Sequence, residues 1–395
     1  MSVAVLTEAV ARPPAGATTR VAAFDGMRGV ACLLVVASHY FGHGYSFSRL
    51  VEGGGTVGVM MFFVLSGYLI GGILIDHHDS PSYFRTFYVR RAFRIFPIYY
   101  VVIGLSPLAM VVCTWTPQYF SIWSYLTYTV NFSMAFSGEY GNALMVPVWS
   151  LCIEEQFYLL FPLLLYALPR HWRLERVLLV LIVLAVVCRG VLAGAGANEL
   201  YGKMLLPTRM DALALGVLAA HVRRTPALRH WLSQDNSIRI KLFTIVGLLI
   251  SPALSVVENF TGMPVWDGLG FLALGVSFAG LILLIADGAP EAKRLRLPLL
   301  CFFGTISYCL YLIHLPILCV LQALILGGIP PNFALGPASL EQTAVTALAF
   351  AVSVGIAFLS WILFEGPLVR YAHRWRYEQT RTSAFAAEPA PELHS

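Results

Sequence analysis

The apolar stretch from Phe24 to His39 carries two ionisable residues that could do chemistry together, Arg28 near its start and His39 at its end. Eleven helical residues make about three turns, so the two side chains fall on nearly one face, about 16 Å apart along the axis. A histidine can serve as a general base or a nucleophile, and an arginine can bind phosphate oxygens. Ionisable side chains are costly inside a bilayer, which makes this stretch a functional candidate. The alternative for His39 is a structural hydrogen bond to a neighbouring helix.

A second cationic group, Arg91 and Arg94, precedes Pro97 at the start of another apolar run. Residues three apart share one face of a helix. Guanidinium groups form paired hydrogen bonds with phosphate oxygens, so this pair is a candidate binding site for a phosphate-bearing substrate. The alternative is that both arginines anchor the helix end among lipid headgroups.

Adjacent carboxylates, Glu154 and Glu155, begin the apolar run that follows Trp149. Neighbouring residues on a helix point about 100° apart, so we expect at most one of the two to face a given site. Glu154 is the candidate. The alternative is a carboxylate pair at a helix N-terminus, stabilised by the helix dipole.

Four more ionisable residues lie within apolar runs and are candidates for a site that binds a second substrate, the acceptor of a transferred group: Arg189, Arg209, Asp211 and His314. For the first three, the alternative is ion pairing between spanning helices. For His314, the alternative is a hydrogen bond to a backbone carbonyl that Pro316 leaves without its helical donor.

The composition indicates which elements must position these residues. The chain of 395 residues is 58% hydrophobic and 12% charged, against about 25% charged residues in ordinary soluble domains. We therefore expect an all-α polytopic membrane protein. Its net charge of +5 does not indicate nucleic-acid binding, because the basic residues lie in short loops between apolar runs. We expect no metal site, since the seven cysteines show no paired spacing with one another or with histidine.

Runs of about 20 apolar residues predict ten spanning helices. They are expected near residues 27–46, 56–75, 95–113, 148–168, 177–195, 203–220, 240–257, 267–286, 299–326 and 341–364. The stretch 120–136 is shorter and more polar. If it does not cross and the N-terminus is cytoplasmic, 22 of the 26 Lys and Arg residues lie on the cytoplasmic side, as the positive-inside rule favours. We therefore expect both termini to be cytoplasmic and 120–136 to be an interfacial or re-entrant helix.

This topology sorts the candidate residues by depth. Arg28, Arg91 and Arg94 are expected near the cytoplasmic surface, and His39 is expected deeper, with the polar residues of the middle and outer half. The candidates thus form two polar groups, a cationic one at the inner surface and a mixed one in the middle and outer half.

One membrane domain is expected over residues 24–376. Residues 1–23 are interpreted as a flexible cytoplasmic arm, because Glu8 and Arg12 interrupt any apolar stretch that could form a signal peptide. Residues 377–395 are rich in Ala, Pro, Glu and Ser and are expected to be disordered.

Several segments, taken in order, resemble the membrane-bound acyltransferase-3 family over most of residues 24–367. No single segment is specific, but the ordered set is. The segments are Phe24–Gly29 leading to His39, Gly58–Tyr68, Arg91 and Arg94 before Pro97, Trp149–Tyr158, Arg209–Gly216, Ser307–His314 and Phe364–Pro367. One departure is Met60, where many members carry an acidic residue.

The resemblance implies an O-acyltransferase that moves an acyl group, most often acetyl, from acyl-CoA to a hydroxyl group of a sugar, surface polysaccharide or similar acceptor. By the same resemblance, Arg28, Arg91 and Arg94 bind the donor and His39 carries the chemistry. His39 would act as a general base or form an acyl-imidazole. A carboxylate, with Glu154 as the candidate, could orient its imidazole.

The implied partners are acyl-CoA, the acceptor and membrane lipids, with no permanently bound cofactor and no nucleic acid. The expected location is the bacterial plasma membrane. The main alternative is a transporter or flippase for a glycan or a lipid-linked intermediate. That class also needs buried charges and commonly shows an inverted repeat, which we do not detect.

Overall fold

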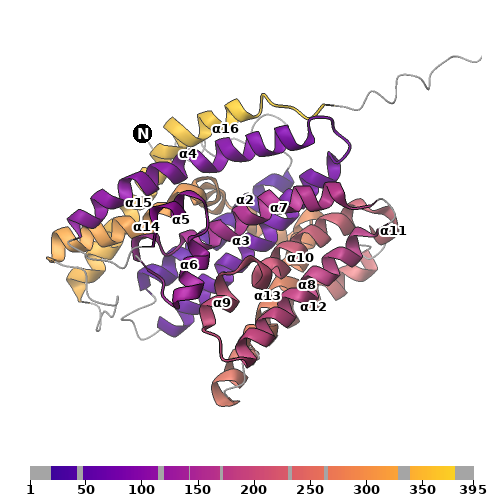
Figure 1. The fold of residues 1–395 in the computed structure, drawn as a ribbon, viewed down its shortest axis with the longest axis horizontal. Coiled ribbons are helices and arrows are strands. Elements are labelled where there is room, and N and C mark those ends of the chain that lie inside the picture. The colour runs from indigo at the N-terminus through magenta and orange to yellow at the C-terminus, as the bar shows by residue number, and fades with distance from the viewer. Residues whose placement is uncertain are drawn as a thin grey trace, which may run out of the picture.

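The computed structural model describes residues 19–41, 48–113, 120–141, 143–169, 172–229, 234–261, 266–327 and 339–378. Within these ranges the regular structure is helical and contains no strand (Figure 1). Ten of the helical stretches are long and apolar enough to cross a membrane. The expected all-α polytopic membrane fold is therefore confirmed.

Each spanning stretch overlaps one of the ten predicted runs. In chain order, the helices that form them are α2 (Thr19–Phe41), α3 (Ser48–Asp76), α4 (Tyr83–Val112), α7 (Val148–Ala167), α8 (Leu174–Gly194), α9 (Glu199–Met204) with α10 (Leu206–Arg224), α12 (Gln234–Thr261), α13 (Phe271–Ala286), α14 (Pro298–Leu326), and α15 (Leu340–Ser360) with α16 (Gly366–Ala372). Helix α2 begins at Thr19, inside the segment expected to be an arm. Residues 1–18 and 379–395 lie outside the described residues, so the flexible arm and the disordered tail stay predictions.

The polar stretch 120–136 contains two short helices, α5 (Ile122–Leu126) and α6 (Val130–Ser137), neither long enough to cross a bilayer. The break between them leaves backbone groups without helical partners. Gln156 Nε2 on α7 donates to Tyr128 O and to Asn131 Oδ1, both at 2.9 Å. Such side-chain bonds allow irregular backbone to lie within a membrane domain.

Ion pairs join several helix ends on one side of the bundle. Arg224 Nε at the end of α10 lies 2.7 Å from Asp76 Oδ1 at the end of α3. Arg223 Nε lies 3.6 Å from Asp287 Oδ1, directly after α13. All four residues belong to segments that the positive-inside rule places on the same side. The compartment that this side faces, and with it the cytoplasmic position of both termini, stays a prediction.

Glycines allow α2 and α14 to pack with their backbones in near contact. A Cβ atom on Gly304 would lie 1.8 Å from Asp25 O, and one on Gly29 would lie 2.1 Å from Leu300 O. Small residues at helix contacts permit this close approach in membranes. The same arrangement recurs between α3 and α10, where a Cβ on Gly67 would lie 2.0 Å from Leu213 O. The two contacts between α2 and α14 lie in the first half of α2, before the turn that carries His39.

Replacing Gly304 by alanine is expected to lower the thermal stability of the protein. The added methyl group has no room beside Asp25 O, so α2 and α14 must separate, and overpacking of this kind costs about 1–3 kcal/mol. The measurement is the unfolding midpoint of the purified protein in detergent. Gly355→Ala on α15 is the control, because nothing lies within 4 Å of its Cβ position. Equal midpoints for the two variants would contradict the packing argument.

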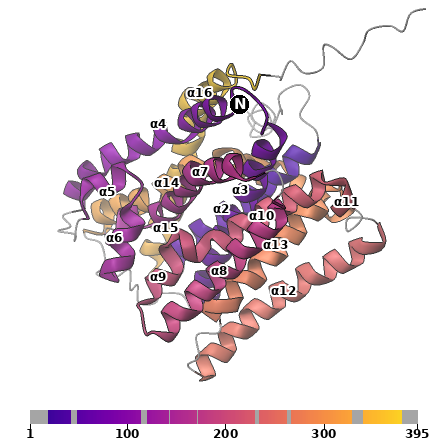
Figure 2. The same ribbon diagram turned by 45° about the vertical axis from the view of Figure 1, so that its right-hand side comes forward.

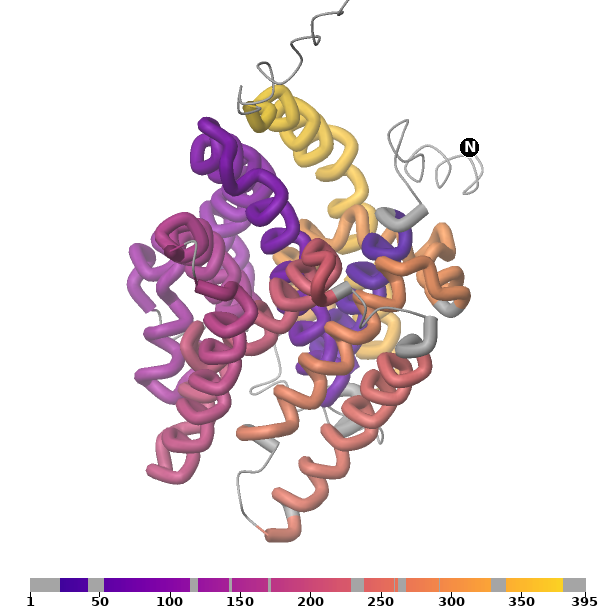
Figure 3. The backbone as a smooth tube through the Cα atoms, turned by 90° about the vertical axis from the view of Figure 1, so that its right-hand side faces the viewer, coloured from indigo at the N-terminus to yellow at the C-terminus, as the bar shows by residue number. Residues whose placement is uncertain are grey.

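Helix α12 lies at the margin of the bundle, where it packs against α13 (Figures 2 and 3). Several of its large apolar side chains are exposed, including Leu242, Phe243 and Leu249. An apolar outer surface suits contact with lipid chains. The buried core instead centres on α2, α3, α10 and α14, which make the most extensive helix contacts.

Candidate active site

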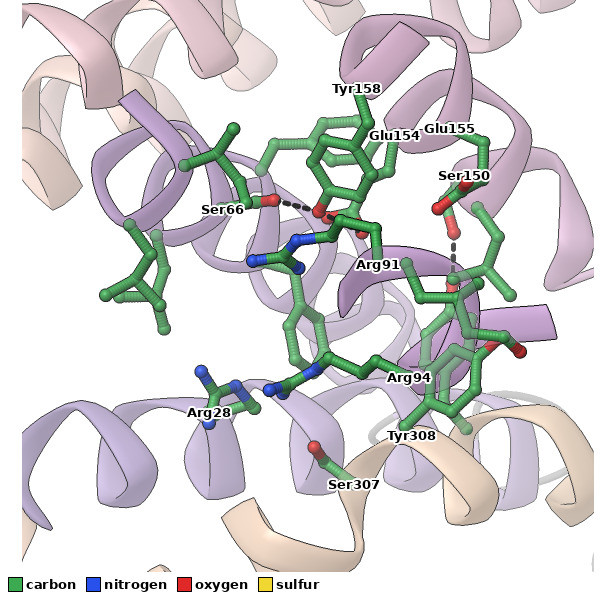
Figure 4. Close-up of a pocket in the computed structure, with 18 of the residues that line it drawn as sticks. Arg28, Ser66, Arg91, Arg94, Ser150, Glu154, Glu155, Tyr158, Ser307 and Tyr308 are labelled. Atoms are coloured by element: carbon green, nitrogen blue, oxygen red, sulfur yellow. Dashed lines mark hydrogen bonds between the residues drawn. The ribbon is translucent and has the colours of Figure 1, made fainter. Parts of the chain in front are cut away.

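Residues from five helices, α2, α3, α4, α7 and α14, meet in a cavity that we call the arginine cavity (Figure 4). Arg28 comes from α2, Arg91 and Arg94 come from α4, and Glu154 and Glu155 come from α7. The other polar lining residues are Ser66, Ser150, Tyr158, Ser307, Tyr308 and Tyr311. In Figure 4 the three guanidinium groups face one shared space. The structure thus brings together the three arginines that the sequence analysis grouped by depth.

The positive charge of this cavity is only partly matched by direct ion pairs. Arg28 Nη1 lies 2.6 Å from Asp25 Oδ1. The guanidinium carbon of Arg91 lies 5.2 Å from the centre of the Tyr158 ring, a cation–π arrangement. Among the described residues, Arg91 and Arg94 form no ion pair within 4.0 Å. Arg94 lines the cavity, and its guanidinium group lies in the same space as those of Arg28 and Arg91 (Figure 4).

Both carboxylates of α7 line the arginine cavity, although we expected at most one to do so. Tyr158 OH donates to Glu154 Oε2 at 3.1 Å and is itself hydrogen-bonded to Ser66 Oγ. Glu155 reaches a second hollow between α4 and α7, which Arg91 and Tyr158 also line. The expectation was wrong because the cavity contacts a broad stripe of α7, which includes the adjacent positions 150 and 151 as well as 154 and 155.

A second cavity, which we call the histidine cavity, contains His39 on α2 and Arg209 on α10. The remaining polar and aromatic lining residues are Ser38, Thr56, Tyr140, Trp149, Lys203, Phe271 and Tyr311. Val59 and Tyr311 line both cavities, so the two adjoin. Tyr311 OH also lies 2.6 Å from Ser150 Oγ in the arginine cavity. Arg28 and His39 therefore open into adjoining spaces.

His39 contacts a histidine from the other end of the chain. Its Nδ1 atom lies 2.8 Å from Nε2 of His314 on α14. His314 Nδ1 lies 3.2 Å from Leu310 O, which is not the carbonyl that Pro316 leaves without a donor, so that alternative is wrong. The expectation that Glu154 orients the imidazole is also contradicted, because His314 holds Nδ1 and Glu154 is bonded to Tyr158 in the arginine cavity.

Arg189 and Asp211 form a fully buried ion pair, with Arg189 Nη2 at 2.6 Å from Asp211 Oδ2. Neither residue lines either cavity. For these two residues the alternative of an ion pair between spanning helices is therefore correct, and the acceptor-site interpretation is wrong. Arg209 does line the histidine cavity. Its Nη2 atom lies 2.9 Å from Met60 Sδ, and its guanidinium carbon lies 3.9 Å from the centre of the Phe271 ring. Met60, at the position where many members of the family carry an acidic residue, therefore places its thioether sulfur beside Arg209.

Three hydroxyl groups of these cavities, those of Tyr158, Tyr311 and Ser150, were not among the candidates predicted from the sequence. Helical spacing could have indicated two of them. Tyr158 follows Glu154 by four residues and Tyr311 precedes His314 by three, so each shares a face with a candidate residue. Within the described ranges, no group of three or more His, Cys, Asp or Glu side chains could hold a metal ion.

Comparison of the sequence with known proteins identifies its family. The model of the acyltransferase-3 family, described as "Acyltransferase domain", matches residues 21–363. The chain therefore belongs to this family of acyltransferases, and its ten apolar helical stretches make it a multi-pass membrane protein.

Two curated relatives illustrate the similarity. O-acetyltransferase OatA of Staphylococcus aureus (strain NCTC 8325 / PS 47) is 28% identical over 343 residues, which cover 78% of this chain and 52% of the relative. The putative O-acetyltransferase SACOL0978 of Staphylococcus aureus (strain COL) is 24% identical over 333 residues, with the same coverage of 78% and 52%. The chain spans about half the length of these relatives. No solved structure matches the chain.

Proposed function

We propose that this protein transfers an acetyl or similar short acyl group from acyl-CoA to a hydroxyl group of a sugar, surface polysaccharide or similar acceptor. The observation that carries the proposal is the pair of adjoining cavities, one lined by three arginines and the other by His39. Membership of the acyltransferase-3 family and the similarity to a protein named O-acetyltransferase support it.

The arginine cavity is the proposed donor site. Coenzyme A carries phosphate groups, and arginine side chains bind phosphate oxygens through paired hydrogen bonds. Arg91 and Arg94 lie one helical turn apart on α4, and Arg28 faces them from α2. With the phosphates held there, the pantetheine arm would extend along Val59 and Tyr311, the residues that line both cavities. Its thioester would then reach the histidine cavity.

His39 is the proposed catalytic residue, by one of two routes. As a general base, a ring nitrogen takes the proton of the acceptor hydroxyl while the hydroxyl oxygen attacks the thioester carbon. The C–S bond then breaks, and the coenzyme A thiolate receives that proton. As a nucleophile, the same nitrogen attacks the thioester carbon first, and the C–S bond breaks to release the thiolate. The hydroxyl oxygen of the acceptor then attacks the acyl carbon, the C–N bond to the ring breaks, and the hydroxyl proton passes to the released thiolate.

The histidine cavity is the proposed acceptor site. Trp149, Tyr140 and Phe271 offer aromatic surfaces, and Arg209 and Lys203 offer hydrogen-bond donors. Pockets with apolar walls and a few polar groups suit an organic acceptor that must be oriented. In the proposed arrangement the donor enters from the cytoplasm and the acceptor from the other side of the bacterial plasma membrane.

The test uses the full chain purified in detergent, with acetyl-CoA labelled in the acetyl group. We expect release of free coenzyme A and appearance of label in an added hydroxyl acceptor or, slowly, in water as acetate. Protein without acetyl-CoA binding and without turnover, but with movement of a glycan across vesicles, would favour the transporter alternative. Mass spectrometry of surface glycans and secreted metabolites from a deletion strain would identify the acceptor.

A further inference from the structure

We infer that His314 is the positioning residue that sets which ring nitrogen of His39 carries the proton. This inference rests on the proposed function, because it explains how His39 is prepared for acyl transfer. This role differs from the two considered above for His314, which were binding of the acceptor and a structural hydrogen bond within the helix.

The hydrogen bonds determine the protonation pattern of the two rings. His314 Nδ1 lies 3.2 Å from Leu310 O, and a carbonyl oxygen can only accept, so Nδ1 of His314 carries the proton. In a neutral ring, Nε2 of His314 is then an acceptor. The 2.8 Å contact between this atom and Nδ1 of His39 therefore requires His39 to donate. With both rings neutral, the Nε2 atom of His39 carries no proton.

This tautomer suits both chemical routes. A general base needs an unprotonated nitrogen to accept the hydroxyl proton, and a nucleophile needs the same lone pair to attack the thioester. Either route leaves a positive charge on the His39 ring. Its Nδ1–H then donates a charge-assisted hydrogen bond to neutral His314, which is stronger than a bond between neutral groups. His314 thus favours the reactive tautomer before the step and stabilises the charged ring during it.

The surroundings hold His314 in place. Its side chain is fully buried. Tyr40 OH, one residue after His39, donates to His314 O at 2.9 Å and lies 3.1 Å from Ser353 Oγ on α15. The His39 and His314 rings are inclined by 17° with their centres 5.0 Å apart. Burial, the contact with the His39 ring and the bond to Leu310 O therefore limit the freedom of the His314 ring, as a preorganised site requires.

Three substitutions of His314 separate positioning from packing. His314→Gln places an acceptor oxygen near the position of Nε2. His314→Met has a similar side-chain length but offers only a weakly accepting thioether. His314→Asn reaches only the position of Nδ1. Each variant is purified in detergent as the full chain, and kcat for acetyl transfer is measured together with the affinity for coenzyme A. His39→Ala is assayed beside them.

We expect His314→Met and His314→Asn to lower kcat by at least about 10-fold, with unchanged affinity for coenzyme A, because the tautomer is no longer fixed. His314→Gln is expected to recover most of the lost kcat. A purely structural role would instead affect glutamine and methionine alike. If the methionine variant does not fold, the comparison of glutamine with asparagine decides.

Two outcomes distinguish failure of the inference from failure of the proposed function. Wild-type kcat in His314→Met or His314→Asn, with an inactive His39→Ala protein, would overturn the positioning role alone. Equal losses in the glutamine and asparagine variants would do the same. Full activity of the His39→Ala protein would overturn the proposed function itself.

Discussion

Alanine at position 39 is expected to lower the rate of acyl transfer by at least about 10²-fold, the usual contribution of a general base. Coenzyme A affinity should remain near the wild-type value, because His39 lines the histidine cavity and the three arginines line the other. A group that acts mainly in the transition state changes turnover more than donor binding. Acetyl transfer and coenzyme A binding are measured on the same detergent-purified samples.

His221→Ala is the matched control for this experiment. His221 also lies on a spanning helix, but its Nε2 atom pairs with Glu175 Oε2 at 3.3 Å and it lines neither cavity. Its variant should keep wild-type turnover. A His39→Ala protein that binds coenzyme A and still transfers acetyl at the wild-type rate would end the proposed mechanism.

Alanine at Arg91 or Arg94 is expected to weaken coenzyme A binding by roughly 10- to 150-fold, because losing a hydrogen bond to a charged group costs about 1.5–3 kcal/mol. Lysine should restore only part of the affinity, since it keeps the charge but lacks the planar fork of arginine. Isothermal titration with the purified protein gives the dissociation constants.

Arg85→Ala controls for the loss of one positive charge. Arg85 lies on the same helix α4 but is exposed outside the arginine cavity. Its variant should bind coenzyme A like the wild type. If Arg91→Ala and Arg94→Ala also bind like the wild type, the two arginines are anchors at the membrane surface and not a donor site.

Helix positions could be predicted from the sequence because lipid imposes a strong local signal. Apolar runs of about 20 residues predict spans, and the ten runs each overlap a helix. The break at 120–136 was also predictable, since its polarity and the distribution of basic residues exclude a crossing. The side-chain bonds that stabilise it, such as those of Gln156, depend on tertiary contact and leave no local pattern.

That Arg28, Arg91 and Arg94 lie together could be predicted from their depth. All three are expected near the same membrane surface, which limits how far apart they can be. The partner of His39 could not be found this way. His314 is 275 residues away, and its contact depends on how closely α2 approaches α14 at Gly29 and Gly304. Glu154 was the predicted partner of His39 because a carboxylate can accept a hydrogen bond from imidazole. Its carboxylate instead accepts from Tyr158, four residues later on the same helix α7.

The buried Arg189–Asp211 pair has a consequence for how the protein is made. Arg189 is on α8 and Asp211 is on α10, so the cation is synthesised 22 residues before its carboxylate. A lone arginine in a membrane helix costs about 2.5–3.5 kcal/mol during insertion by the translocon. That cost falls when Asp211 arrives, and Arg189 also donates to Thr208 O at the start of α10. Because this cost is offset only when both helices are in the bilayer, we expect the membrane insertion of α8 to depend on that of α10.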